Sequence, residues 1–283
     1  MDEAPNAAPN AAQAEYWNDG AGPTWVEMQA PLDRQLQPLG RLAMAALSPR
    51  PGERILDIGC GAGETTLELA DRLQPGGLAT GLDISATLLA LARRRAAGRS
   101  GVEFLEADAQ THPFALGGYD AVFSRFGVMF FADPAAAFAN LRRALKPGGR
   151  LAFVCWRTPA ENEVMTLPMV AASAFLPPPP PAEPGAPGPF AFADPERVRG
   201  ILRAAGFADV DLAPHDLKIG AGSLEDALGL ALRVGPLGAA LREHPDKRER
   251  VVDAMRAALA TRDGPDGVKL QSATWVVTAR NEG

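Results

Sequence analysis

The chain has 283 residues, of which 47% are hydrophobic and 22% charged, and its formal net charge is −6. This length and apolar content suffice for one large α/β domain with additional segments. The acidic balance argues against a nucleic-acid partner, because proteins that bind nucleic acids usually present a basic face.

Targeting signals and metal motifs are also missing from the sequence. No stretch reaches the roughly 18 consecutive apolar residues that a membrane span requires, and residues 1–5 have neither the basic start nor the apolar run of a signal peptide. Cys60 and Cys155 do not form a C-x-x-C pair, so we expect no metal site. These observations predict a soluble, cytoplasmic protein without a membrane partner.

Two segments precede the main part of the chain. Residues 1–14 consist mainly of Ala, Pro and Asn, and we predict that they are a disordered tail. Residues 15–50 are predicted to form an N-terminal helical cap with an amphipathic run over 28–47. Pro49 and Pro51 end that run, because proline disfavours helix at its own position and at the preceding residue.

Residues 51–283 alternate apolar strands with helices, which predicts an α/β fold with a doubly wound, mostly parallel seven-stranded sheet. The first strand is expected at the topological switch point, where ligands bind beyond the carboxyl ends of the strands. Strands are predicted at 54–58, 78–82, 102–105, 120–124, 151–156, 208–213 and 273–279, and helices at 64–73, 85–97, 134–145 and 194–205.

Two insertions interrupt this pattern, at about 157–193 and about 218–272. The first contains the proline-rich stretch Pro177–Pro189, which we interpret as a stiff loop or linker, with a docking motif as the alternative. The second contains helical patterns near 224–242 and 246–261. Both insertions leave the carboxyl ends of strands, so we expect them to form helical lids over the ligand site.

The first strand runs directly into a glycine-rich turn, Gly59-Cys60-Gly61-Ala62-Gly63, and a helix follows. Such a turn cradles nucleotide-like ligands, because glycine permits positive φ and close approach of a ligand. The second strand ends at Asp83, where a carboxylate can accept hydrogen bonds from a ribose. Glu64 occupies the third glycine position of the dinucleotide fingerprint G-x-G-x-x-G, so a nicotinamide cofactor is disfavoured.

Four motifs follow one another along the chain, at Leu56–Gly63, Gly81–Ser85, Phe104–Ala109 and Leu145–Val154. Through these motifs and their order, roughly residues 40–156 resemble the class I S-adenosylmethionine (SAM)-dependent methyltransferases. The resemblance implies a Rossmann-like methyltransferase fold with an antiparallel last strand, and SAM as the cofactor. It also implies a general likeness to the quinone and sterol methyltransferases of that family.

The glycine turn is the part that would hold the methionine end of SAM, according to this resemblance. Gly59, Cys60 and Gly61 would present backbone groups to it. Asp57 would bind the α-ammonium group, directly or through water. The alternative for Asp57 is that its carboxylate accepts hydrogen bonds from the amides of the glycine turn and holds the turn in place.

The adenosine end of SAM would be bound by residues after the second and third strands. Asp83 would accept hydrogen bonds from the ribose diol, and Ile84 would pack on the adenine. Asp108 and the amide of Ala109 would contact the adenine edge. Purely local alternatives are a helix N-cap at Asp83 and a turn residue at Asp108.

The loop after the fourth strand lines the space between cofactor and acceptor in the family. Ser124 is therefore a candidate cofactor contact, and Arg125 and Met129 are candidates for the acceptor pocket. A buried arginine needs an acceptor, and Asp133 is the alternative partner for Arg125.

Aromatic residues of the predicted cap are further candidates. Trp17 could lie near the sulfonium, where an aromatic face gains cation–π energy, and Tyr16 could donate to the methionine carboxylate. Trp25 is a candidate for the acceptor pocket. Both tryptophans could instead simply anchor the cap on the core.

The sequence does not identify a general base. Arg125 and His244 are weak catalytic candidates, whereas His112 and His215 lie in a loop and on a strand. A thiolate, neutral amine or carbanion acceptor would need no base.

The resulting hypothesis is methyl transfer from SAM to a small, partly apolar acceptor. A SAM-binding protein of the same fold, with non-methylating chemistry or a structural SAM ligand, is the alternative. A dehydrogenase and a non-enzymatic partner protein are weaker hypotheses.

Overall fold

The computed structural model describes residues 8–178, 183 and 185–283. Its centre is a seven-stranded sheet in the order β3-β2-β1-β4-β5-β7-β6. Strands β1 to β5 run parallel, whereas β7 is antiparallel to both of its neighbours. The strands are β1 (Arg54–Ile58), β2 (Leu78–Asp83), β3 (Val102–Glu106), β4 (Tyr119–Arg125), β5 (Leu145–Trp156), β6 (Ala208–Gly222) and β7 (Val268–Arg280).

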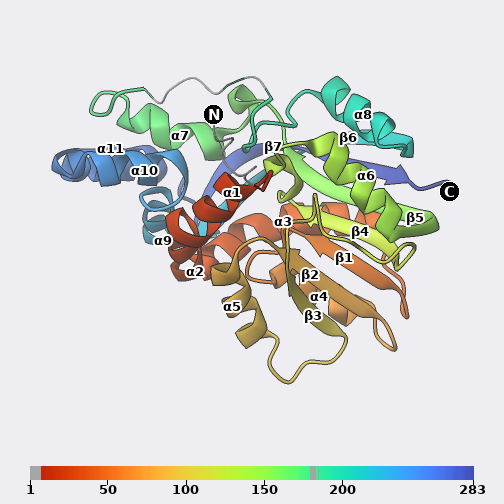
Figure 1. Cartoon of the computed structure of the whole chain (residues 1–283). Coiled ribbons are helices and arrows are strands. Elements are labelled where there is room, and N and C mark those ends of the chain that lie inside the picture. The colour runs from red at the N-terminus through yellow and green to blue at the C-terminus, as the bar shows by residue number, and fades with distance from the viewer. Residues whose placement is uncertain (1–7, 179–182, 184) are drawn as a thin grey trace, which may run out of the picture.

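This sheet confirms the predicted fold class, with β1 at the switch point between β2 and β4 (Figure 1). Helix α3 (Gln29–Leu47) packs against β4 to β7, and α4 (Glu64–Arg72) packs against β1 to β3. Helix α5 (Ala86–Arg95) contacts β2 and β3. Helices α6 (Pro134–Ala144) and α8 (Pro195–Ala204) contact one another. Helix α6 also contacts β5, and α8 contacts β6. The predicted helices of the sheet are thus confirmed.

The N-terminal prediction is wrong for the described part of residues 1–14. Helix α1 (Ala11–Glu15) is formed, and Asn10 before it is buried with 3% of its surface exposed. Residues 1–7 lie outside the described part of the chain. A π-helical turn (Tyr16–Gly20) and helix α2 (Gly22–Glu27) continue to α3. The segment is ordered because its polar groups bond to distant loops of the sheet.

The second insertion differs from its predicted bounds, because β6 and β7 extend into it as a long hairpin. Gly222 pairs with Val268, so the insertion comprises residues 223–267. The predicted helix at 224–242 is broken into α9 (Leu224–Ala231) and α10 (Gly235–Glu243). Gly235 has φ 77°, and Pro236 follows it, which interrupts a continuous helix. Helix α11 (Arg248–Ala260) matches the pattern at 246–261.

Helices from both insertions gather into one bundle at the edge of the molecule (Figure 1). Helix α7 (Glu163–Ala172) of the first insertion contacts α10 and α11, and α11 also contacts α9. We call α7, α9, α10 and α11 the lid bundle. None of the described helices is both long enough and apolar enough to cross a membrane.

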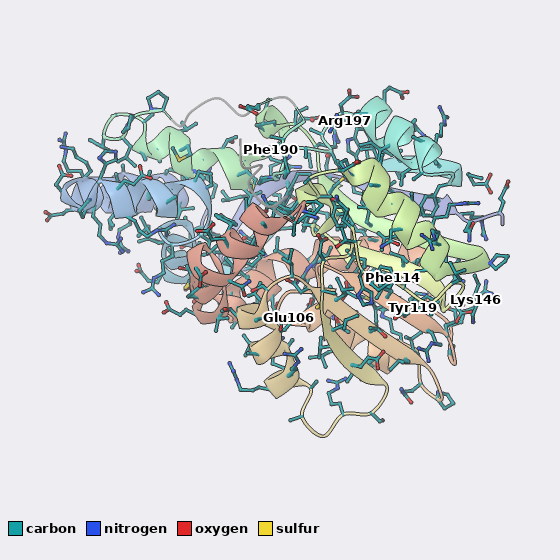
Figure 2. All side chains as sticks on the ribbon, viewed as in Figure 1. Glu106, Phe114, Tyr119, Lys146, Phe190 and Arg197 are labelled. Carbon is teal, nitrogen blue, oxygen red and sulfur yellow. The ribbon has the colours of Figure 1, made fainter. Side chains whose placement is uncertain are left out.

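The apolar residues form two separate clusters. The larger covers the sheet and includes Leu39 and Met44 of α3, so this helix belongs to the central core. The smaller lies inside the lid bundle around Leu237, Met255 and Leu259. Charged side chains such as Lys146 and Arg197 lie at the periphery of the molecule (Figure 2).

Candidate functional site

A cavity of about 590 Å³ lies at the carboxyl ends of the parallel strands. Its walls come from α1 to α3, from the loops after β1 to β4, and from the lid bundle with the adjoining ends of β6 and β7. This volume lies in the range of small-molecule sites. The cavity therefore lies where open α/β sheets bind their ligands.

The glycine turn forms one wall of this cavity. Gly59, Gly61 and Gly63 have φ of 65°, 54° and 79°, a region that residues with a side chain rarely adopt. A Cβ on Gly59 would lie 2.7 Å from the Cα of Gly127, so the turn packs tightly against Gly127. A Cβ on Gly61 would meet nothing within 4 Å, because Gly61 faces the open cavity. A ligand can thus approach the backbone at Gly61.

Asp57 lies behind the turn and does not line the cavity. Its Oδ2 accepts hydrogen bonds of 2.7 Å from the hydroxyls of both Thr65 and Thr66 at the start of α4. Its Oδ1 is buried without a hydrogen-bond partner in the described part of the chain. Burial raises the pKa of this carboxyl to about 6, against the lowering effect of the two threonines and Arg125. Asp57 therefore anchors the start of α4 behind the turn through the two threonine hydroxyls, and not through the glycine-turn amides that the local alternative expected.

Asp83 connects the glycine turn to the end of β2 and lines the cavity. Its Oδ2 accepts from the backbone N–H of Gly61 at 2.7 Å, and its Oδ1 accepts from the N–H of Ser85 at 2.8 Å. Burial raises the pKa of the Asp83 carboxyl, while these N–H groups lower it. Each carboxylate oxygen has a second lone pair for a ligand hydroxyl. Ile84 lines the cavity beside it.

Asp108 is held by a residue that sequence reasoning missed. The Asn10 Nδ2 donates to both carboxylate oxygens of Asp108, at 3.0 and 2.9 Å, and the N–H of Ala132 donates to Asn10 Oδ1 at 2.8 Å. Asp108, Ala109 and Asn10 all line the cavity. An asparagine before a helical run signals an N-cap, but nothing in the sequence indicates a partner 98 residues away.

Ser124 does not reach the cavity. Its hydroxyl donates to the carbonyl of Ile58 at 2.7 Å and accepts from the N–H of Gly127 at 3.1 Å. Ser124 therefore ties the end of β1 to the loop after β4. Phe126 follows with φ 63°, and its ring stacks on that of Trp156 at 4.3 Å between ring centres.

Arg125 lines the cavity, but its guanidinium has protein partners. Its Nη1 donates to Glu64 Oε2 at 2.6 Å, and its Nη2 lies 3.8 Å from Asp33 Oδ1. The alternative partner Asp133 is wrong, because that carboxylate caps α6 by accepting from the N–H of Ala136. The paired Arg125 closes one side of the cavity rather than presenting an uncompensated positive charge.

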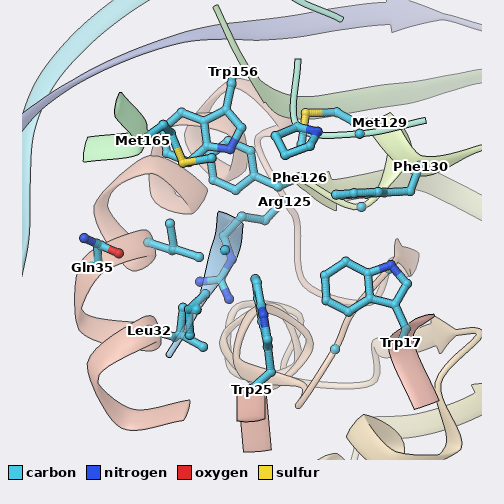
Figure 3. A pocket seen from close by; sticks show the side chains of 18 of the residues that line it. Trp17, Trp25, Leu32, Gln35, Arg125, Phe126, Met129, Phe130, Trp156 and Met165 are labelled. Carbon is cyan, nitrogen blue, oxygen red and sulfur yellow. The ribbon is translucent and has the colours of Figure 1, made fainter. Parts of the chain in front are cut away.

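Aromatic rings surround the middle of the cavity (Figure 3). Trp17 makes edge-to-face contacts with Tyr16, Trp25 and Phe130, with ring centres 5.1 to 5.3 Å apart. Met129 lines the same space. Trp156 lines the opposite side and was missed from the sequence, although its place at the carboxyl end of a strand could have indicated it.

Candidate bases are scarce around the cavity. None of the three histidines lines it, and His244 lies at the C-terminal end of α10, outside the cavity wall. The ionisable side chains among the described lining residues are those of Tyr16, Cys60, Asp83, Asp108 and Arg125. Burial raises the pKa of the Cys60 thiol well above its usual value. Among the described residues no group of three or more His, Cys, Asp or Glu could hold a metal ion.

Comparison with known proteins agrees with this geometry. The family model "Methyltransferase domain" matches residues 56–153. A demethylmenaquinone methyltransferase of Thermus thermophilus is 37% identical over 172 residues, covering 58% of this chain and 77% of the relative. Nocamycin O-methyltransferase of Saccharothrix syringae is 30% identical over 203 residues, covering 68% and 72%.

Solved structures show the same fold at low sequence identity. The YcgJ protein of Bacillus subtilis is 17% identical and has a TM-score of 0.54, with 86% of this chain and 97% of that chain covered. Phosphoethanolamine N-methyltransferase 2 of Haemonchus contortus, solved with S-adenosylhomocysteine, is 18% identical and has a TM-score of 0.52, with 96% of this chain and 57% of that chain covered. At these identities the similarity shows the fold alone.

The residues at the strand ends also fit SAM. Gly61 leaves open space that a Cβ would fill, and Asp83 and Asp108 bring two carboxylates to the same wall. The relatives, the matched domain and this geometry agree. The chain belongs to the class I SAM-dependent methyltransferases and is an enzyme that uses SAM as its methyl donor.

Proposed function

We propose that this methyltransferase acts on a small, largely apolar acceptor by in-line displacement, with S-adenosylhomocysteine as the other product. The observation that carries the proposal is that one cavity joins Gly61, Asp83 and Asp108 to the apolar interior of the lid bundle. Donor and acceptor can therefore meet inside one cavity. The names of the two relatives, which act on demethylmenaquinone and nocamycin, support a small organic acceptor.

The donor end of the cavity has the groups that SAM requires. Asp83 would accept from the ribose hydroxyls, Asp108 and Ala109 would contact the adenine, and Gly59 to Gly61 would hold the methionine end. Bound SAM supplies an electrophilic methyl group on a positively charged sulfur. Trp17, inside the aromatic cluster, would face this charge.

The acceptor end offers no histidine, glutamate or lysine among the described lining residues. The protein would therefore act by position and desolvation, which align the nucleophile and exclude water. An acceptor suited to this site is already ionised, or is a neutral nucleophile that loses its proton after transfer. We further propose that residues 15–28 and the lid bundle cover a SAM-binding body formed by α3 and the rest of 51–283, because the apolar side chains of α3 belong to the central core.

Asp83→Ala tests the donor site. Loss of charge-assisted hydrogen bonds should weaken SAM binding by about 1.5–3 kcal/mol, roughly tenfold to a hundredfold in Kd. Isothermal titration calorimetry with SAM and S-adenosylhomocysteine measures this effect. Glu106→Ala is the matched control, because Glu106 ends the next strand but is exposed and lies outside the cavity wall. Unchanged affinity in folded Asp83→Ala would remove Asp83 from the ribose role.

Transfer of labelled methyl to a metabolite panel tests the reaction itself. Methylated products in the organic phase would support an apolar acceptor. Tight SAM binding without transfer to any extract would favour the alternative of a SAM-binding protein with non-methylating chemistry.

A further inference from the structure

The cavity does not stop at the acceptor side of the donor site but enters the lid bundle. Leu237, Met255 and Leu259 are each at most 1% exposed and belong to the separate apolar cluster of the bundle. The same three residues line the cavity. Part of the cavity is therefore an internal space between α7, α9, α10 and α11, which we call the lid recess.

The lid recess is apolar throughout. Every described lining residue of α7, α9, α10 and α11 is apolar and uncharged, and none has a side-chain N–H or O–H group. Short residues on α9 and α10, namely Ala227, Ala231 and Ala239, leave room between the larger aliphatic side chains. A polar group placed in this recess would lose its hydration without gaining a partner, which costs several kcal/mol. A hydrocarbon group there loses only contact with water, which is favourable.

Polar groups are concentrated at the opposite end of the cavity, where Asn10, Asp83 and Asp108 line it. Arg125 lies between Trp25 and Trp156, beside the aromatic cluster (Figure 3). The aliphatic lining begins beyond these residues, at Met165 and Met169 of α7. The cavity is thus polar where the donor binds, aromatic in the middle and aliphatic in the lid.

We propose that the acceptor is amphiphilic, with a reactive head in the aromatic middle of the cavity and an aliphatic tail in the lid recess. This inference rests on the proposed function and specifies its substrate class. Ala231 and Ala227 would set the length of tail that the recess admits, because a longer side chain at either position would project into the same space.

Binding of two homologous probe series tests the tail directly, without turnover. The probes are n-alkanoic acids from butanoic to tetradecanoic acid and n-alkyl gallates from methyl to dodecyl, titrated calorimetrically into the full chain saturated with S-adenosylhomocysteine. Affinity in at least one series should rise about fourfold per methylene and then level off when the recess is full. Affinity independent of chain length in both series, or no binding of any probe, would overturn the inference.

Two substitutions that fill the recess locate the tail. Ala231→Leu and Ala227→Leu should each lower the affinity for the longest bound tail at least tenfold and leave the shortest probes unaffected. Ala257→Leu is the matched control, since it places the same side chain on the exposed face of α11. Equal affinities in all three variants would place the tail outside the recess. Unchanged thermal unfolding identifies folded variants.

Binding of S-adenosylhomocysteine to the parent chain distinguishes failure of the proposed function from failure of the amphiphilic acceptor alone. If the parent chain does not bind it, the proposed function and this inference both fail. If it binds and the probes show no dependence on tail length, only the amphiphilic acceptor is wrong.

Discussion

The buried carboxylate of Asp57 has hydrogen-bond partners among the described residues on only one of its two oxygens. Two threonine hydroxyls satisfy one carboxylate oxygen, while the other has no partner in the described part of the chain. The contacts fix the start of α4 behind the glycine turn. They only partly offset the loss of hydration, so the pKa of Asp57 is raised from 3.8 to about 6.

This raised pKa predicts a pH-dependent loss of stability. The folded protein holds the Asp57 proton more tightly than the unfolded chain, so the free energy of unfolding should fall as pH rises from about 4 to about 6. The contribution is about 3 kcal/mol, at about 1.4 kcal/mol per pKa unit. Asp57→Asn retains the threonine bonds but cannot ionise. Relative to the parent it should gain about this amount between pH 4 and pH 7.

Urea unfolding of the parent and Asp57→Asn at several pH values measures this difference. Glu106→Gln, at an exposed position, controls for the loss of a negative charge. Parallel pH profiles for the parent and Asp57→Asn would show that Asp57 ionises normally in the folded protein.

The segment Asn10–Glu27 shows how an element becomes ordered through distant contacts. Asn10 bonds to Asp108 after β3 and to Ala132 after β4. Further along, the hydroxyl of Ser85, after β2, donates to the carbonyl of Trp17 at 2.7 Å. The segment thus spans the loops after three strands and covers the cavity from the donor side.

Asn10→Ala should release this cover. The substitution removes the Asn10 donor from Asp108, which keeps the N–H of Gln110, and leaves the N–H of Ala132 without its acceptor. Helix α1 should therefore exchange amide hydrogen faster, and S-adenosylhomocysteine should dissociate several-fold faster. Hydrogen-exchange mass spectrometry and stopped-flow displacement measure the two effects. Glu15→Ala, at an exposed position of the same helix, should change neither. Slower dissociation in Asn10→Ala would mean that Asn10 competes with the donor instead of retaining it.

At the scale of the whole molecule, the two apolar clusters divide the structure by role. The cluster on the sheet fixes the strand ends that carry Asp83 and Asp108, whereas the cluster in the lid bundle borders the lid recess. Among the described buried residues of the sheet cluster, only Leu230 of α9 comes from the lid bundle. The donor site should therefore tolerate loss of the lid helices better than the acceptor site does.

Deletion of residues 223–262 tests this division. Residues 263–267 would remain as the connection between β6 and β7, whose ends are paired at Gly222 and Val268. Calorimetry should still detect S-adenosylhomocysteine binding, while methyl transfer should be abolished because the acceptor loses its apolar wall. Equal loss of donor binding and transfer would show that these helices are part of the core that forms the donor site.

Sequence-local features accounted for the sheet, its helices and the position of Asp83 and Asp108 at strand ends that border the cavity. Alternation of apolar strands with amphipathic helices predicted the strand centres and the parallel core. The break at Gly235-Pro236 could have been predicted from the sequence, since proline disfavours helix at the residue before it, but the helical patterns on either side suggested one continuous helix. The lengths of β6 and β7 could not be predicted, because strand ends in a hairpin depend on pairing with the partner strand.

The sequence by itself determined the strand–turn–helix at Gly59–Gly63 and the carboxylates at the ends of β2 and β3, because backbone conformation and strand periodicity act over a few residues. Only the tertiary structure decided that Asn10 holds Asp108, that Arg125 pairs with Glu64 rather than Asp133, and that the cavity continues into the lid bundle. These features depend on contacts between segments far apart in the chain. Such contacts form only when the whole chain packs, so no local sequence pattern predicts them.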